Sequence, residues 1–267
     1  MQSQVESGIE LLARLNKRPS LRGLEDMLFF EGPRSTDVIE ISGEQSSGKT
    51  LLLSQLLAKC ILPNYREIRG CNASAVLINT KHHFQISKLV RLMKNIINAA
   101  NTVSFTTDTV DMEFDETAVI KNSLRNLLVI DCYNSEQFAL TLRMLDDIFV
   151  KRTKIALLAI DSITAHYWQN CQDNFITVDA YVKNLLQLVR THTAQFNVAT
   201  IYTKLYKSIN NKKLTDDINY RIHLCKTCNT CTLKTTQTVK KIYYSILSNG
   251  IKWKMDEKEI PVKKENN

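Results

Sequence analysis

The chain has 267 residues, of which 44% are hydrophobic and 23% are charged. These proportions are ordinary for a folded domain in water, and the length suits one large domain or one domain with small appendages. No apolar run approaches the length of a membrane span, and the first ten residues lack the basic start and apolar stretch of a secretory signal, so we expect neither a membrane partner nor secretion. The seven cysteines are scattered and odd in number, which favours reduced thiols in the cytosol or the nucleus.

The formal net charge of +8 lies entirely in the last quarter of the chain. Residues 204–267 contain 14 lysines and arginines against 6 aspartates and glutamates, whereas the residues before them contain 21 of each kind. A neutral body with a basic end region is typical of a protein that binds a polyanion. A solvated, lysine-rich surface explains the same charge equally well.

The N-terminal region predicts a short amphipathic helix over residues 5–15, because Val5, Ile9 and Leu12 fall on one helical face. A second, weaker segment and a loop follow before the first core strand. The helix either covers the core or docks a partner, and the sequence leaves both open. We expect three regions, namely an N-terminal helix and linker (1–34), a nucleotide-binding domain (35–255) and a charged C-terminal tail (256–267).

The strongest motif lies between a β-branched run at 38–41 and a run of helix formers at 51–57. It reads G-x-x-x-x-G-K-T and comprises Gly43, Glu44, Gln45, Ser46, Ser47, Gly48, Lys49 and Thr50. In the order strand, turn, helix, this pattern predicts a loop whose backbone amides and helix N-terminus hold nucleotide phosphates. Lys49 is expected to reach the β- and γ-phosphates, and Thr50 is expected to bind Mg²⁺. The alternative is a Gly/Ser turn before an ordinary helix.

The rest of the chain alternates apolar runs with stretches of helical periodicity. We expect strands at 75–79, 127–131, 155–161 and 198–202, helices at 84–100, 136–149 and 178–195, an acidic loop at 101–121, and a hairpin over 241–254 that turns at Asn249-Gly250. Since several strands are continuously apolar, the predicted fold is α/β, with a mostly parallel twisted sheet, helices on both faces and a C-terminal antiparallel hairpin.

Two aspartates compete for a role in holding Mg²⁺. Asp161 and Asp131 each end a predicted strand, and a carboxylate at the C-terminal end of a strand beside a phosphate loop holds the metal directly or through water. Asp161 is favoured because a hydroxyl follows it and its strand is longer and more apolar. The predicted metal ligands are therefore Thr50 and Asp161, and a helix N-cap is the alternative role for Asp161.

The end of the 75–79 strand lacks the carboxylate that ATP hydrolysis needs to orient or activate water. It reads Asn79-Thr80-Lys81-His82-His83. The two histidines could accept a proton there, although a histidine pair at a strand end is more often structural or simply exposed. We therefore assign no catalytic residue.

Two further clusters lie in the basic end region. His223, Cys225, Cys228 and Cys231 have the spacing of metal ligands, but they offer three thiols and one crowded histidine, and chance spacing is the alternative. Residues 204–221 interleave basic side chains with two tyrosines, which suits single-stranded nucleic acid as well as a lysine-rich surface loop.

Five segments, taken in order, resemble the RecA-like recombinase paralogues. They read ESGIELLARL, ISGEQSSGKT, AKCILP, VLINTKHHF and LLAIDSITAHYW. The resemblance implies a RecA-like P-loop NTPase core that binds ATP and Mg²⁺, without the helical N-terminal domain of most relatives. It also implies a nuclear subunit for homologous-recombination repair of DNA double-strand breaks. Such a subunit would assemble with another paralogue, the D-type, in a multi-paralogue complex, and would meet single-stranded or junction DNA directly or through that complex.

Two positions depart from the pattern of the active recombinases. Those proteins carry a catalytic Glu where this chain has Lys81, and a Gln that senses the γ-phosphate where it has Lys204. The resemblance therefore implies weak or absent ATP hydrolysis, with both lysines facing the γ-phosphate and favouring bound ATP over ADP. The alternatives are an autonomous DNA-dependent ATPase and a scaffold with a vestigial nucleotide site.

Overall fold

The computed structural model describes residues 7–9, 17–65, 67–104, 115–170, 176–205 and 218–254. The predicted helix over 5–15, the segment 206–217 and the charged tail therefore lie wholly or largely outside the described residues. Among the helices of the described ranges, none combines the length and the apolar character that crossing a membrane requires.

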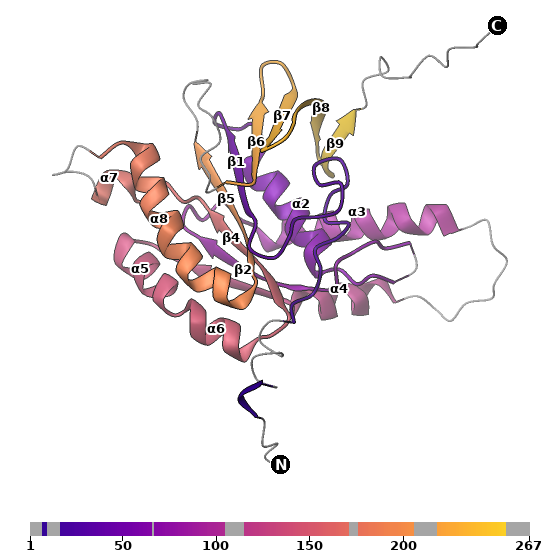
Figure 1. Ribbon diagram of the computed structural model, residues 1–267. Helices are drawn as coiled ribbons and strands as arrows, with labels where there is room; N and C mark the ends of the chain where they lie inside the picture. The colour runs from indigo at the N-terminus through magenta and orange to yellow at the C-terminus, as the bar shows by residue number, and fades with distance from the viewer. Residues whose placement is uncertain are drawn as a thin grey trace, which may run out of the picture.

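A nine-stranded sheet forms the centre of the described part of the chain (Figure 1). Its strands are β1 (Val38–Gly43), β2 (Ser74–Asn79), β3 (Leu127–Asp131), β4 (Ile155–Asp161), β5 (Ala199–Leu205), β6 (Tyr220–Cys225), β7 (Thr230–Thr235), β8 (Val239–Leu247) and β9 (Gly250–Lys254). They lie in the order β3-β2-β4-β5-β1-β6-β7-β8-β9. The pairs from β3 across to β6 are parallel and those from β6 to β9 are antiparallel, which confirms the predicted sheet and its antiparallel end.

Helices cover both faces of the parallel part of the sheet (Figure 1). They are α2 (Lys49–Ile61), α3 (Ile86–Ser104), α4 (Glu116–Leu124), α5 (Ser135–Arg143), α6 (Leu145–Lys151), α7 (Tyr167–Asn170), α8 (Val178–Thr193) and the 3₁₀ turn η1 (Ala194–Phe196). In Figure 1, α2, α3 and α4 lie on one side of the strands, and α5, α6 and α8 lie on the other. The core accordingly divides into two clusters of buried apolar side chains, one under each helical layer.

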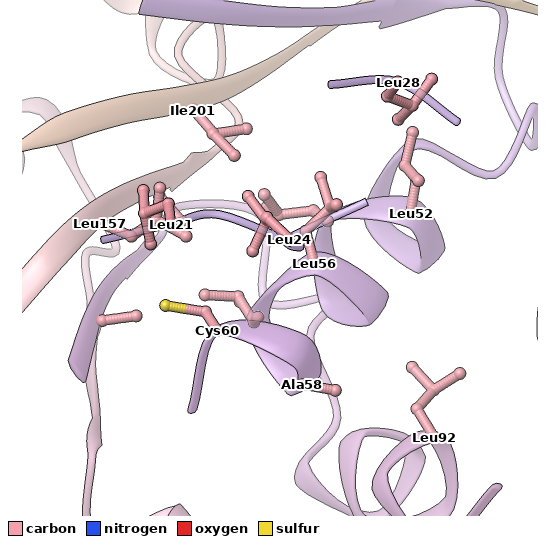
Figure 2. Packing of buried hydrophobic residues seen from close by; sticks show 14 of the residues in the cluster. Leu21, Leu24, Leu28, Leu52, Leu56, Ala58, Cys60, Leu92, Leu157 and Ile201 are labelled. Carbon is pink, nitrogen blue, oxygen red and sulfur yellow. The ribbon is translucent and has the colours of Figure 1, made fainter. Parts of the chain in front are cut away.

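The larger cluster packs α2 against the sheet and against residues N-terminal to β1 (Figure 2). Leu52 and Leu56 of α2 are fully buried, as are Leu24 and Leu28 from the segment before the first strand. Each such leucine stabilises the fold by about 1.5–3 kcal/mol relative to an exposed position. The predicted boundary at residue 34 stays a prediction, but part of the region assigned to the linker contributes side chains to this core.

Two predicted elements differ from the structure. The prediction of an acidic loop over 101–121 is wrong at both ends, because α3 continues to Ser104 and α4 starts at Glu116. The side chain of Asp115 accepts a hydrogen bond from the Ala118 amide, and this N-cap starts α4. The single helix expected at 136–149 is two helices, α5 and α6, which meet at Met144. Two aspartates in the first turn of α6 stabilise the new N-terminus.

The C-terminal hairpin forms, but its turn lies one residue earlier than expected. Leu247 pairs with Gly250, so Ser248 and Asn249 are the turn residues. A Cβ at Gly250 would lie 2.8 Å from Oε1 of Gln55, and its φ is +130°. The glycine is therefore needed for the close approach of β9 to α2 rather than for the turn itself. Strands β6 and β7 were not predicted, and they extend the sheet between β1 and this hairpin.

Candidate functional site

The loop between β1 and α2 wraps around the ammonium of Lys49. Ser46 and Gly48 have φ values of +60° and +95°, which bend the backbone into the turn ahead of α2. The Nζ atom of Lys49 donates hydrogen bonds to the carbonyl oxygens of Gly43 at 2.9 Å and Glu44 at 2.5 Å. Burial lowers the pKa of Lys49, and repulsion from the nearby ammonium of Lys81 lowers it further. The positive charges of Lys49 and Lys81 therefore both act at this loop.

Thr50 and Asp161 meet beside the loop. The Thr50 hydroxyl donates to Oδ2 of Asp161 at 2.8 Å, and the Thr203 hydroxyl on β5 donates to Oδ1 of the same carboxylate. Asp161 ends β4 and is almost fully buried. Strands β4 and β5 and the first turn of α2 thus place one carboxylate and one hydroxyl, both hard oxygen donors, next to the loop amides.

Asp131, the competing carboxylate, is engaged elsewhere. It accepts a hydrogen bond from Nδ2 of Asn79 at 2.6 Å and lies 3.4 Å from Nδ1 of His82. The ring of His82 in turn stacks on Tyr133 with a centroid separation of 4.3 Å. Of the two aspartates, the structure therefore brings Asp161 to Thr50 and leaves Asp131 in a contact with the histidine that follows β2.

The end of β2 is fixed to the end of β4, and this fixes the backbone of Lys81. The Thr80 hydroxyl donates to the Ser162 carbonyl at 2.8 Å and accepts from the Ser162 amide at 2.7 Å. The amides of Thr80 and Lys81 both donate to the carbonyl of Asp161. Lys81 is exposed, and its charge acts on Lys49. A cation, and no carboxylate, thus follows β2 beside the phosphate loop.

Lys204 does not lie beside the phosphate loop, where the sequence analysis expected it. Side chains alternate along β5, so Thr203 points at Asp161 while Lys204 points to the opposite face of the sheet. There its Nζ atom lies 2.9 Å from Oε2 of Glu40 and 3.8 Å from Oδ1 of Asp179. The expectation that Lys204 faces the γ-phosphate is corrected by this ion pair, which holds its ammonium against a buried carboxylate.

Glu40 is a buried carboxylate that sequence reasoning missed. It lies in the middle of β1 with 1% of its surface exposed, and its carboxylate accepts from the Tyr202 hydroxyl at 2.8 Å and from Nε of Arg221 at 2.8 Å in addition to Lys204. The sequence did contain a signal for this, because the charge of a glutamate inside a buried apolar strand needs a hydrogen-bonding or oppositely charged partner. Lys204 and Arg221 flank residues 206–217, so Glu40 ties together the two ends of that connection.

The candidate metal ligands in the basic region, whose spacing left metal binding open, are not brought together in the described residues. Among them, no group of three or more His, Cys, Asp or Glu side chains is arranged to hold a metal ion. Cys231 is buried on β7, and Nδ1 of His223 lies 3.2 Å from the Ser42 hydroxyl. Cys225 and Cys228 remain close to each other at the turn between β6 and β7.

The donor set of the loop fits a magnesium nucleotide. An ammonium, a helix N-terminus and bent backbone amides suit phosphate oxygens, and the Thr50 hydroxyl with the Asp161 carboxylate suits Mg²⁺. A separate hollow of about 760 Å³ lies at the other end of the strands, with Asp37, Asn197 and Asn219 in its lining. It contains none of the loop residues and is not part of this site.

Comparison with known proteins places the chain in a family. The mouse DNA repair protein XRCC2 is 28% identical over 239 residues, which cover 84% of this chain and 80% of the mouse protein. The DNA repair protein XRCC2 homolog of Arabidopsis thaliana is 22% identical over 197 residues, which cover 65% of this chain and 51% of that protein. The Rad51 family model matches residues 22–215, well over half of the chain, and confirms both the predicted RecA-like fold and the predicted resemblance to recombinase paralogues. The chain therefore belongs to the Rad51 family.

Proposed function

We propose that this chain is a recombinase-paralogue subunit that serves homologous-recombination repair of DNA double-strand breaks in the nucleus. Membership of the Rad51 family and the likeness to the mouse DNA repair protein XRCC2 support this role. The observation that carries the biochemical part is the contact between Thr50 and Asp161 beside an intact phosphate loop. The subunit binds MgATP as a lasting ligand and does so with little or no turnover.

In this proposal the loop residues 43–50 hold the nucleotide phosphates. The ammonium of Lys49 exchanges its bonds to the Gly43 and Glu44 carbonyls for bonds to phosphate oxygens. Thr50 and Asp161 hold Mg²⁺, which neutralises phosphate charge when bound. Thr203 keeps the Asp161 carboxylate oriented toward Thr50.

Lys81 is the reason for slow turnover. An ammonium cannot accept a proton from water, so it cannot replace a carboxylate as general base. Its charge adds to that of Lys49 beside the same loop and favours ATP, which carries more negative charge than ADP. Lys204 has no part in this preference, because Glu40 and Asp179 occupy it on the opposite face.

The proposed partners follow from the family and from the charge. The chain assembles with another recombinase paralogue of the D-type within a multi-paralogue complex, and the predicted helix over 5–15 is its docking element. The basic end region supports contact with single-stranded or junction DNA, directly or through the complex.

A calorimetric titration of the full chain with MgATP tests the nucleotide proposal. Lys49→Ala removes a charge-assisted hydrogen bond of about 1.5–3 kcal/mol and should weaken binding about tenfold or more. Lys88→Ala, an exposed lysine on α3, is the matched control and should bind like the wild type. Equal affinities for MgATP in wild type and Lys49→Ala would favour a scaffold with a vestigial site. In a turnover assay, release of phosphate from ATP that DNA stimulates would favour an autonomous ATPase.

A further inference from the structure

Two thiols meet at the turn that joins β6 to β7. Cys225 ends β6 and Cys228 lies in the turn, and their Sγ atoms are 2.8 Å apart. Both are free thiols, with Cys228 exposed and Cys225 partly exposed. Since a disulfide needs its sulfurs about 2.05 Å apart, a shift of under about 1 Å would join them.

The surroundings of Cys225 favour its thiolate, in contrast to those of the buried cysteines. Hydrogen bonds from the Cys228 thiol and then from Thr227 lower the pKa of Cys225, and a lower pKa raises the fraction of nucleophilic thiolate. In contrast, burial raises the pKa of Cys231 to about 12 and that of Cys71 to about 11. An oxidant that meets the folded chain would therefore react first at this turn.

The turn is connected to the phosphate loop through Tyr244 on β8. The Tyr244 amide donates to the carbonyl of Asn229, the last residue of the turn, at 2.9 Å. The hydroxyl of the same tyrosine donates to the carbonyl of Ser47 in the phosphate loop at 3.0 Å. In addition, Gly43 is packed so closely on Leu224 that a Cβ would lie 2.4 Å from the Leu224 carbonyl oxygen. A change in the backbone of the turn thus has two short routes to the loop.

We propose that Cys225 and Cys228 form a redox-responsive dithiol, which a small-molecule disulfide such as oxidised glutathione converts to an intrachain disulfide. The Cys225 thiolate attacks one sulfur of the glutathione disulfide, forms a mixed disulfide and releases one glutathione thiolate, which takes up a proton. The Cys228 thiolate then attacks the Cys225 sulfur and releases the second glutathione. The protein loses two electrons and two protons, and one glutathione disulfide becomes two thiols.

The sequence offers a direct readout, because trypsin cleaves after Lys226 between the two cysteines. The full chain is equilibrated with mixtures of reduced and oxidised glutathione, quenched with acid, alkylated and digested. We expect peptides 222–226 and 227–234 to stay joined until a reductant is added, with loss of alkylation at both cysteines. In Cys228→Ser we expect glutathione on Cys225 instead, and in Cys231→Ser we expect the joined pair as in the wild type.

Two results would overturn the disulfide. In the first, a ratio of reduced to oxidised glutathione is chosen at which Cys228→Ser carries glutathione on Cys225. If the wild type at that same ratio is fully alkylated at both Cys225 and Cys228, no disulfide forms between them. The other is a joined pair that persists in Cys228→Ser and is lost in Cys231→Ser, because the partner would then be Cys231.

Hydrogen exchange of the amides in residues 43–50 tests the connection to the phosphate loop without any nucleotide. Oxidation should shift this exchange in the wild type and leave it unchanged in Cys228→Ser treated in the same way. Unchanged exchange in the oxidised wild type would overturn the connection through Tyr244. Neither readout uses nucleotide, so failure of the proposed ATP binding would not be mistaken for failure of the redox site.

Discussion

The buried carboxylate of Glu40 allows a quantitative prediction about Lys204. Glu40 is 1% exposed and is surrounded by three donors, namely Tyr202, Lys204 and Arg221, at 2.8–2.9 Å. Lys204→Met removes one cation and keeps much of the apolar stem. Because Arg221 and Tyr202 remain, the loss should be that of one hydrogen bond to a charged group, about 1.5–3 kcal/mol of the free energy of unfolding.

Removing both cations should cost more. In Lys204→Met combined with Arg221→Met, the buried carboxylate keeps only the Tyr202 hydroxyl, and breaking a buried ion pair in this way costs about 3–5 kcal/mol. That is a large part of the roughly 5–15 kcal/mol that stabilises an ordinary domain. Adding Glu40→Gln to the double variant should recover much of the loss, since a neutral amide costs less to bury than an unpaired charge.

Urea unfolding followed by circular dichroism measures these differences at constant pH. Lys183→Met, an exposed lysine of α8, controls for the substitution itself and should change the free energy of unfolding little. The reasoning is refuted if the double variant is no less stable than Lys204→Met, or if Glu40→Gln destabilises the double variant further.

Three other predictions concern single positions. Lys81→Ala should reduce a wild-type preference for ATP over ADP in paired titrations, and an unchanged preference would show that this ammonium does not face the phosphates. Hydrogen bonds lower the pKa of Cys225, whereas burial raises that of Cys71 to about 11, so Cys225 has more thiolate at a given pH and should be alkylated at lower pH than Cys71. The reverse order in mass-spectrometric labelling would contradict this. Gly250→Ala should destabilise the fold by about 1–3 kcal/mol, because its φ of +130° and the 2.8 Å approach to Gln55 both oppose a Cβ; thermal unfolding identical to wild type would reject this packing argument.

Local sequence signals predicted the parallel core well. The runs that became β2 and β4 are continuously apolar, and the phosphate loop has a strand before it and a helix after it, so each could be recognised from a short window. Helical periodicity also identified the 136–149 region as helical, and Phe138 and Phe149 from it are in the core. Its break at Met144 was not visible, because no residue there opposes a helix and the tertiary packing decides it.

Features that depend on the pairing of distant strands could not be predicted. Lys204 was assigned to the nucleotide from its position in the chain, yet a shift of one residue along a strand moves a side chain to the other face. Its partner, Glu40, is 164 positions earlier and becomes adjacent only when β1 pairs with β5. Strand β6 was missed although Tyr220, Ile222 and Leu224 alternate with more polar residues, so its local signal was present. Strand β7 reads TCTLKT, which has few apolar residues, and it becomes part of the sheet by pairing with β6, where Cys225 lies opposite Thr230.

The fate of bound nucleotide tests the central claim most directly. The full chain is loaded with MgATP labelled on the γ-phosphate, separated from free nucleotide, and sampled over time for ATP and released phosphate. If Lys81 replaces the carboxylate that activates water, the nucleotide that remains on the protein should be intact ATP over many minutes. Release of phosphate at about 1 s⁻¹ or faster, the low end of ordinary enzyme turnover, would contradict the account of an ATP-binding subunit with a silent site.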